Sequence, residues 1–122
     1  MFFLDSYALI EMAKGTPNNL PSRDEAEITS RTDLLEAYSI LTQLNEESLA
    51  NACFAALRGN AMELELDLIP TIARFRLRTL GATGRRFSYV DACGYVYARG
   101  NGYAFLTGAY ELEGFPAVTF VR

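Results

Sequence analysis

Histidine is absent from the 122 residues of this sequence. Its absence excludes Ser-His and Cys-His nucleophilic catalysis, and it removes the usual general base and the commonest zinc ligand. Cysteine is scarce: Cys53 and Cys93 lack CxxC spacing, so we expect buried thiols of a reducing compartment rather than a disulfide or a metal site. Any catalysis must therefore rest on carboxylates, hydroxyls or arginine.

Long apolar runs and a basic leader are also missing. No run approaches the ~20 apolar residues that span a bilayer, and the N-terminal stretch "MFFLDSYALIEM" has an acid at its fifth residue. We therefore expect no signal peptide, no membrane association and a cytoplasmic location. The length, with half of the residues apolar and 21% charged, predicts one globular domain over residues 1–122.

Basic residues are outnumbered, and the net charge of −4 argues against a protein that coats nucleic acid non-specifically. Ten of the eleven basic residues are arginine, however, and five arginines fall within thirteen residues: Arg74, Arg76, Arg78, Arg85 and Arg86. Such a cluster can bind phosphate even on an acidic protein, which makes these arginines candidate RNA contacts. The alternative is a solvated helix face with ion pairs to neighbouring acids.

The spacing of apolar residues alternates between strand and helix patterns. It predicts strands at "MFFL" (1–4), "YAFLTG" (103–108) and "AVTFVR" (117–122), with "MELELDLI" (62–69) as a strand or a short edge piece. It predicts helices over residues 6–14, capped by Ser6, and over 29–44, 45–60, 69–84 and 88–100, with a turn-rich loop at 15–25. Strands separated by helices imply a mostly parallel central sheet in a three-layer α/β/α domain, whose crevice lies beyond the carboxyl ends of the strands.

Two of these helices have clear apolar faces. The helix over 29–44 places five apolar residues on one broad face: Leu34, Leu35, Tyr38, Leu41 and Leu44. The helix over 69–84 turns Ile72, Phe75 and Leu80 inward, with arginines between them. The helix from Tyr89 is apolar around almost its whole circumference, so we expect it to be largely buried.

Three acids occupy informative positions. Asp5 ends the first predicted strand, and its alternative role is to cap the helix that follows. Asp91 is the only acid of the apolar helix and lies in its first turn, where a capping box with Ser88 is the alternative. Glu36 lies at the border of an apolar arc, where a solvated glutamate is ordinary, and the neighbouring Asp33 fits a first-turn residue favoured by the helix dipole.

Four segments carry a resemblance to a known family: "MFFLDSYALIE", "ITSRTDLLEAYSIL", "FSYVDACGYVYA" and "FLTGAYELEGFPAVTFVR". In this order and spacing they resemble the PIN domain, and most closely the small single-domain VapC-like toxins of toxin–antitoxin pairs. The similarity covers essentially the whole chain. It implies an α/β/α fold and an endoribonuclease that uses Mg²⁺ or Mn²⁺, commonly forms a homodimer and is held inactive by an antitoxin protein.

The family pattern also implies particular site residues. Asp5 matches the acid after the first strand, Glu36 the helical glutamate and Asp91 the acid that opens the late helix, so these three would be the catalytic and metal-binding carboxylates. The family's fourth acid would fall at residue 109, where this sequence has Ala109. The resemblance thus implies a metal-dependent RNA-cleaving toxin that is impaired in this chain, with a rate loss on the order of 10²-fold or more if the missing acid positions the nucleophile.

The residues around Ala109 leave alternatives open. A natural divergence and an engineered replacement would both account for the alanine. Glu111 or Glu113 would have to approach from a different backbone position to replace the missing carboxylate, so we expect neither to do so. Ser6 and Thr107 could donate hydrogen bonds to the carboxylates or to metal-bound water, with capping and turn roles as the alternative.

Two other functions compete with the nuclease. One is a non-catalytic module that holds RNA or a protein partner with the same crevice and the arginine cluster. The other is a phosphate-handling domain of receiver or phosphatase type, which Asp5 superficially permits, but the expected neighbouring acids and a late lysine are missing. Tyr38 and the aromatic residues of "GYVYARGNGY" offer apolar area for a dimer or an antitoxin segment, unless the core takes them up.

Overall fold

The computed structural model describes residues 1–15 and 26–121, so most of the predicted loop at 15–25 lies outside the described part. The strands are β1 (Phe2–Leu4), β2 (Glu27–Ser30), β3 (Ala61–Met62), β4 (Ala104–Thr107) and β5 (Val118–Phe120). The helices are α1 (Ser6–Lys14), α2 (Arg31–Gln43), α3 (Glu47–Leu57), α4 (Ile69–Thr83) and α5 (Tyr89–Gly100). Short 3₁₀ turns lie at Arg58–Asn60, Leu66–Leu68 and Tyr110–Leu112.

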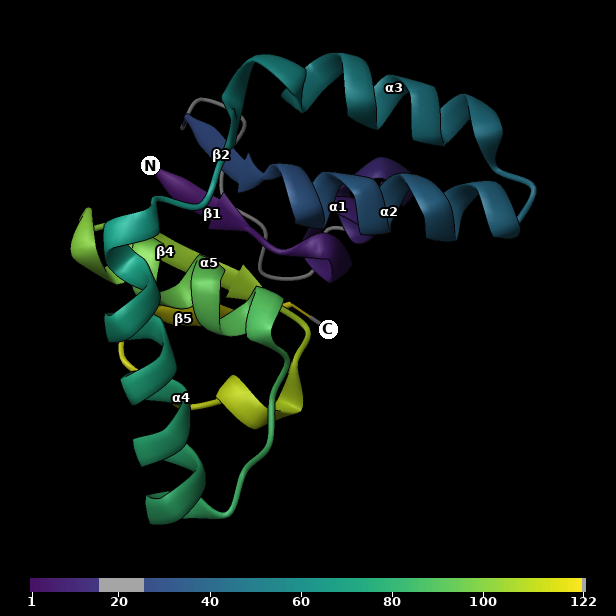
Figure 1. Cartoon of the computed structure of the whole chain (residues 1–122). Helices are drawn as coiled ribbons and strands as arrows, with labels where there is room; N and C mark the ends of the chain where they lie inside the picture. Colours follow the sequence, from purple (N-terminus) through teal and green to yellow (C-terminus); the bar gives the residue numbers. More distant parts are fainter. Residues whose placement is uncertain (16–25, 122) are drawn as a thin grey trace.

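The five strands form a parallel sheet in the order β3-β2-β1-β4-β5. Figure 1 shows α1, α2 and α3 on one side of this sheet and α4 and α5 on the other. The chain runs outward from β1 through β2 to β3 and then returns to β4 on the opposite side of β1. The order therefore reverses at β1 and β4, and such switch points are where open α/β sheets bind ligands.

Two apolar clusters fill the space between the three layers. Leu4 and Leu106 pack with α1, α2 and α3, whereas Phe3 and Phe105 pack with α4 and α5. Successive strand residues point to opposite faces, so β1 and β4 each feed both clusters. The predicted three-layer α/β/α fold is confirmed, and its central strands are apolar on both faces because helices cover both.

Helix α5 approaches the sheet closely because Gly94 faces the strands. A Cβ on Gly94 would lie 2.8 Å from the Phe3 ring and 3.1 Å from the Phe105 ring, so a larger residue would push the helix away. The prediction that α5 is largely buried holds for Ala92, Tyr95 and Ala98. It is wrong for Tyr89, which is 68% exposed.

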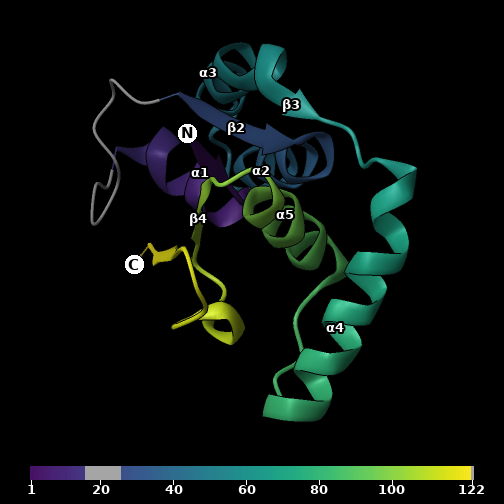
Figure 2. The same ribbon diagram turned by 90° about the vertical axis from the view of Figure 1, so that its left-hand side faces the viewer.

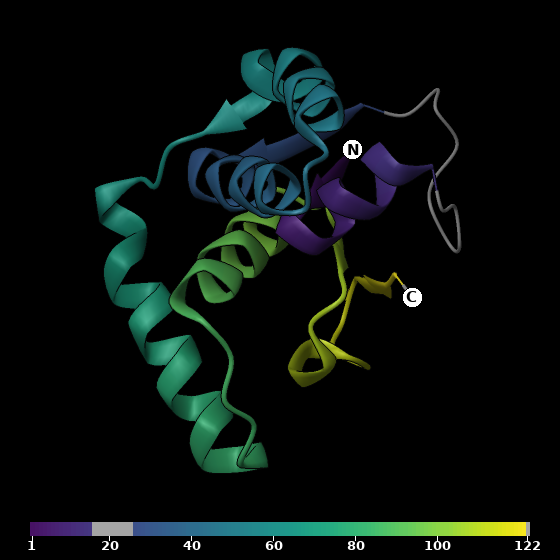
Figure 3. The same ribbon diagram turned by 90° about the vertical axis from the view of Figure 1, so that its right-hand side faces the viewer.

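Helix α4 extends away from the body of the molecule, as the turned views in Figure 2 and Figure 3 show. Its inward residues include Ile72, which is buried, and Phe75 and Leu80, which are half-buried, as predicted. None of the helices in the described residues is long and apolar enough to cross a bilayer.

Two local predictions are wrong, and a third is decided between its alternatives. The segment 29–44 is not helical from its start: β2 ends at Ser30 and α2 begins at Arg31, because short strands with polar residues lack a readable period. The segment 62–69 contributes only Met62 to the sheet, in the edge strand β3, so the short edge piece is confirmed and the longer strand is not. Asp5, rather than Ser6, is the N-cap of α1.

The predicted apolar face of α2 is also only partly buried. Leu34 and Leu41 are in the core, but Leu35 is 66% exposed and Leu44 is 51% exposed. The buried face instead includes Asp33, which shares one side of the helix with residues four and eight positions later. The positions of the leucines therefore predicted the buried face of this helix only in part.

Candidate active site

Asp5 lies at the carboxyl end of β1, at the switch point of the sheet, and is only 3% exposed. Its Oδ1 accepts the Ala8 N–H at 2.8 Å, and its other oxygen accepts the Thr107 hydroxyl. The Gly108 N–H also donates to this carboxyl. Burial raises the pKa of Asp5 to about 6 although these three donors lower it, and the charge of Asp91 raises it further.

Asp33 is a site residue whose burial sequence reasoning missed. It is 1% exposed at the start of α2, where its Oδ1 accepts the Ser6 N–H at 3.1 Å and its Oδ2 accepts the Ser30 hydroxyl at 2.6 Å. Burial is the main reason that the pKa of Asp33 lies well above its ordinary value, and the charges of Asp5, Asp91 and Glu36 add to it. The sequence held one sign of this burial, because Asp33 is four residues from Ala37 and therefore lies on the same face of the helix. Its position in the first turn instead favoured a solvent-exposed aspartate.

Glu36 and Asp91 complete the group of acids. Glu36 is exposed, and its Oε2 accepts the Ser6 hydroxyl at 3.1 Å. Asp91 is half-buried in the first turn of α5, where its N–H donates to Ser88 Oγ at 3.0 Å, which is the Ser88 half of the capping box given as the alternative. Burial, followed by the charges of Glu36 and Glu111, raises the pKa of Asp91.

The structure therefore brings Asp5, Glu36 and Asp91 within electrostatic range of one another, together with Asp33. Each comes from a different element: the end of β1, helix α2 and the start of α5. Repulsion among these acids adds to burial, which is the larger cause, in raising the pKa values of Asp5, Asp33 and Asp91. A bound cation would relieve this repulsion.

The turn that contains Ala109 lies beside Asp5. The Ala109 N–H donates to Thr107 Oγ1 at 2.9 Å, and the same hydroxyl donates to Asp5. Ala109 is half-buried and precedes the 3₁₀ turn Tyr110–Leu112. Glu111 and Asp91 both line a hollow of 410 Å³, so the nearest later acid faces Asp91.

The donor set fits a hard divalent cation in kind. Carboxylate and hydroxyl oxygens are the ligands that Mg²⁺ and Mn²⁺ prefer, and Mg²⁺ is usually bound by one or two carboxylates together with waters and substrate phosphates. Among residues 1–15 and 26–121, no three Asp, Glu or Cys side chains converge into a ready-made cage. Asp5, Glu36 and Asp91 are the carboxylates that would hold such an ion.

The five clustered arginines do not form one patch. Arg74 and Arg78 lie on the exposed outer face of α4, whereas Arg76 lies on its half-buried inner face and donates from Nε to the Phe87 carbonyl oxygen at 2.9 Å. Arg85 donates from Nη1 to the carbonyl oxygens of Glu113 at 3.0 Å and Glu111 at 3.3 Å. Arg86 is exposed and lines the hollow that contains Asp91, together with Arg76.

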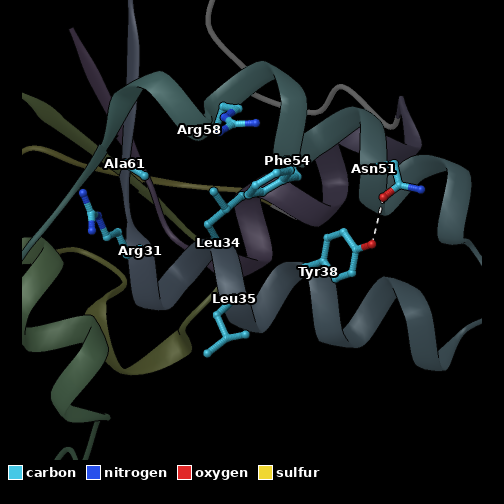
Figure 4. Close-up of a pocket in the computed structure, with 8 residues that line it drawn as sticks. All are labelled: Arg31, Leu34, Leu35, Tyr38, Asn51, Phe54, Arg58 and Ala61. Carbon is cyan, nitrogen blue, oxygen red and sulfur yellow. Dashed lines mark hydrogen bonds between the residues drawn. The ribbon is translucent and has the colours of Figure 1, made fainter.

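A second surface lies between α2 and α3, away from the acids. Figure 4 shows the residues that line this groove, which has a volume of 670 Å³. The exposed Phe54 lies on α3, and the exposed Leu35 projects from α2 on the side away from α3. The Tyr38 hydroxyl donates to Asn51 Oδ1 at 2.8 Å within it. The guanidinium of Arg58 lies 5.2 Å from the centre of the Phe54 ring.

Both cysteines are free thiols. Cys53, on the inner face of α3, is buried as predicted, whereas Cys93 is only half-buried. Burial raises the pKa of both thiols, and the charge of Asp33 contributes at Cys93. Neither thiol is therefore an activated nucleophile.

No protein-family model matches the sequence, and no curated protein matches it significantly. Two solved structures are similar in fold. A chain of a toxin–antitoxin complex from Klebsiella pneumoniae superposes with a TM-score of 0.70 at 15% identity, covering 98% of this chain and 96% of that one. The toxin VapC20 of Mycobacterium tuberculosis, which cleaves the sarcin-ricin loop, superposes with a TM-score of 0.69 at 17% identity, covering 93% and 92%. The chain therefore shares the α/β/α fold of these two structures along nearly its whole length.

Proposed function

We propose that this protein is the scaffold of a metal-dependent endoribonuclease, the toxin component of a toxin–antitoxin pair. The observation that carries the proposal is the placement of Asp5, Glu36 and Asp91 at the switch point of a fold shared with an RNA-cleaving toxin. Without histidine in the chain, carboxylates are the groups that can organise phosphodiester hydrolysis. The low identity to both neighbours means that the site, and not the sequence match, supports the activity.

The residues present suit that chemistry. A divalent cation held by Asp5 and Asp91 would neutralise charge on the phosphate and lower the pKa of a bound water. Asp5 is oriented by Thr107, Gly108 and Ala8, so its carboxyl is fixed before substrate arrives. Ser6 links two of the acids, because its N–H donates to Asp33 and its hydroxyl donates to Glu36.

Ala109 should impair the site. An acid at this position would stand next to Asp5, since Thr107 Oγ1 bonds both the Asp5 carboxyl and the residue 109 N–H. Its loss lowers the negative charge that attracts the cation and removes a group that could orient the attacking water. Glu111, which faces Asp91, is the acid that could partly compensate.

The groove between α2 and α3 is the proposed docking surface for an antitoxin segment. Its exposed apolar side chains Leu35 and Phe54 would be covered by an amphipathic helix, and Arg58 at its edge favours an acidic one. The toxin–antitoxin complex among the structural neighbours is the reason to propose this partner. Hydrogen exchange with an acidic amphipathic peptide tests this assignment. Protection of the backbone amides around Phe54, without protection of those in α4, would support it.

A homodimer is a further part of the proposal. Leu66, Ile69 and Leu77 are 78%, 45% and 71% exposed along α4 and the turn before it. Apolar side chains on a helix that stands away from the body are typical of an interface between copies. Light scattering should give a dimer mass for the chain and a monomer mass for Leu77→Glu, and a monomeric parent would contradict this part.

The second candidate is a non-catalytic module that binds RNA or protein through the same crevice. It is favoured by Ala109 and by the absence, among the described residues, of three acids that converge as a cage. The nuclease candidate predicts that an acid at residue 109 restores RNA cleavage, whereas the binding module predicts that it does not.

Cleavage of a mixed RNA pool with Mn²⁺ tests the proposal. We compare the chain, Ala109→Asp, and Ala109→Asp combined with Asp5→Asn, using Glu113→Gln as a control that removes an exposed carboxylate nearby. We expect Ala109→Asp to raise the rate by about 10²-fold, and Asp5→Asn to abolish the gain. Equal rates for the chain and Ala109→Asp would show that three acids suffice, and no cleavage by either would favour the binding module.

A further inference from the structure

The exposed ring of Tyr89 is the feature that the proposed function leaves unexplained. Tyr89 begins α5, two residues before Asp91, and is 68% exposed, whereas residues 90–98 of the same helix are buried or half-buried. Arg76 packs against this ring, but no core covers the rest of it. The exposed ring beside the candidate carboxylate Asp91 could therefore contact a ligand with an apolar, planar face.

The Tyr89 ring is held in place rather than free to rotate. The guanidinium of Arg76 lies 4.0 Å from the ring centre, and Arg76 Nε is fixed to the Phe87 carbonyl oxygen at 2.9 Å. One face of the ring therefore carries an oriented cation, which is supplied by the inner side of α4. A ring that is already ordered loses less entropy when a second planar group stacks on it.

Hollows flank Tyr89 and Asp91. Tyr89 lines a hollow of 440 Å³ with Met62, Val90 and the hydroxyl-bearing Ser30 and Thr32. Arg76 does not line it; it lines instead the hollow of 410 Å³ that contains Arg86 and Asp91. The ion pair of Arg31 and Glu63 also lines the hollow beside Tyr89, which therefore combines apolar walls with hydrogen-bonding and charged groups.

We propose that the hollow beside Tyr89 is a nucleobase subsite, in which a base of single-stranded RNA next to the scissile phosphate stacks on the Tyr89 ring. Stacking on an aromatic ring is the common way in which proteins hold an unpaired base. Arg86 and Asp91 lie on the other side of the first turn of α5, so a strand that crosses this turn passes from the phosphate position to the base position. This inference rests on the proposed function, because the RNA is its substrate.

The subsite also changes the expected role of the arginines. Arg76 was a candidate phosphate contact, but its guanidinium is occupied by the Tyr89 ring and the Phe87 carbonyl. Arg86 is exposed at the neighbouring hollow and is the arginine placed to meet a phosphate. Base recognition and phosphate recognition are therefore divided between Tyr89 and Arg86.

The test is RNA binding by the full chain in EDTA, measured by fluorescence anisotropy. The probes are a labelled single-stranded oligoribonucleotide and an abasic oligomer of the same length and charge. The variants are Tyr89→Leu, Tyr89→Phe, which keeps the ring, and Tyr38→Leu, which removes a tyrosine from the groove between α2 and α3. Circular dichroism and thermal melting check that each variant is folded.

We expect the chain and Tyr89→Phe to bind the base-bearing RNA at least about fivefold more tightly than the abasic oligomer. Tyr89→Leu should lose most of this preference, with an unchanged salt dependence because no charge is removed. Tyr38→Leu should keep the preference. A chain without the preference, or a folded Tyr89→Leu that keeps it, would overturn the subsite, whereas the nuclease proposal stands or falls separately on cleavage by Ala109→Asp.

Discussion

Replacing Asp5 with asparagine should make the protein more stable at pH 8 and not at pH 4. The folded protein raises the pKa of Asp5 from 3.8 to about 6, with burial as the main cause. A carboxyl whose pKa is raised on folding contributes stability that is fully present below its unfolded pKa and is lost as the pH rises through the folded value. The change from 3.8 to about 6 corresponds to about 3 kcal/mol of free energy of unfolding that is lost between roughly pH 4 and pH 7.

Asparagine removes the charge but not the side-chain volume. Its Oδ1 can still accept the Ala8 N–H, whereas its amide nitrogen cannot accept from Thr107 or the Gly108 N–H. Leaving buried donors without this acceptor costs about 1–3 kcal/mol. The net expectation at pH 8 is therefore a gain of up to about 2 kcal/mol, which corresponds to a melting temperature higher by up to roughly 8 °C for a chain of this size.

Urea unfolding followed by circular dichroism, in EDTA at one-unit steps from pH 4 to pH 8, measures this effect. The difference in free energy of unfolding between Asp5→Asn and the parent should rise with pH, and Glu113→Gln, which removes an exposed carboxylate, should show no such rise. A difference that is constant across the range would refute the reasoning, because burial of the charge would then not be the cause. Added Mn²⁺ should stabilise the parent at pH 8 and leave Asp5→Asn unchanged, since the variant lacks the proposed ligand.

Further predictions concern packing and hydrogen bonds around the site. Thr107→Val removes a hydroxyl that lowers the pKa of Asp5, so the loss of stability with rising pH should extend to a higher pH than in the parent, as titration of unfolding would show. Arg85→Gln should lower the free energy of unfolding by about 1–2 kcal/mol and leave RNA affinity unchanged, because Arg85 is committed to two loop carbonyls; an RNA affinity that falls with unchanged stability would contradict this. Gly94→Ala should cost about 1–3 kcal/mol in urea unfolding, because its Cβ would lie 2.8 Å from the Phe3 ring, and an equally stable variant would show that α5 can shift freely.

Much of the architecture could be predicted from the sequence. The apolar runs at β1 and β4 and the amphipathic spacing of α4 are local patterns, and strands alternating with helices have few arrangements other than a covered parallel sheet. The positions of Asp5 and Asp91, directly after a strand and in the first turn of a helix, followed from the same patterns. They needed no knowledge of distant contacts, because the carboxyl edge of such a sheet is common to all its strands.

Long-range contacts decided the rest. Asp33 is buried because the Ser6 N–H, 27 residues away, donates to it, and helical periodicity carries no record of that partner. Tyr89 is exposed although its helix is apolar, because α4 presents Arg76 to its ring instead of a core. Local spacing determines which side chains share a face, but whether a face meets core, solvent or another charge depends on what the rest of the chain packs against it.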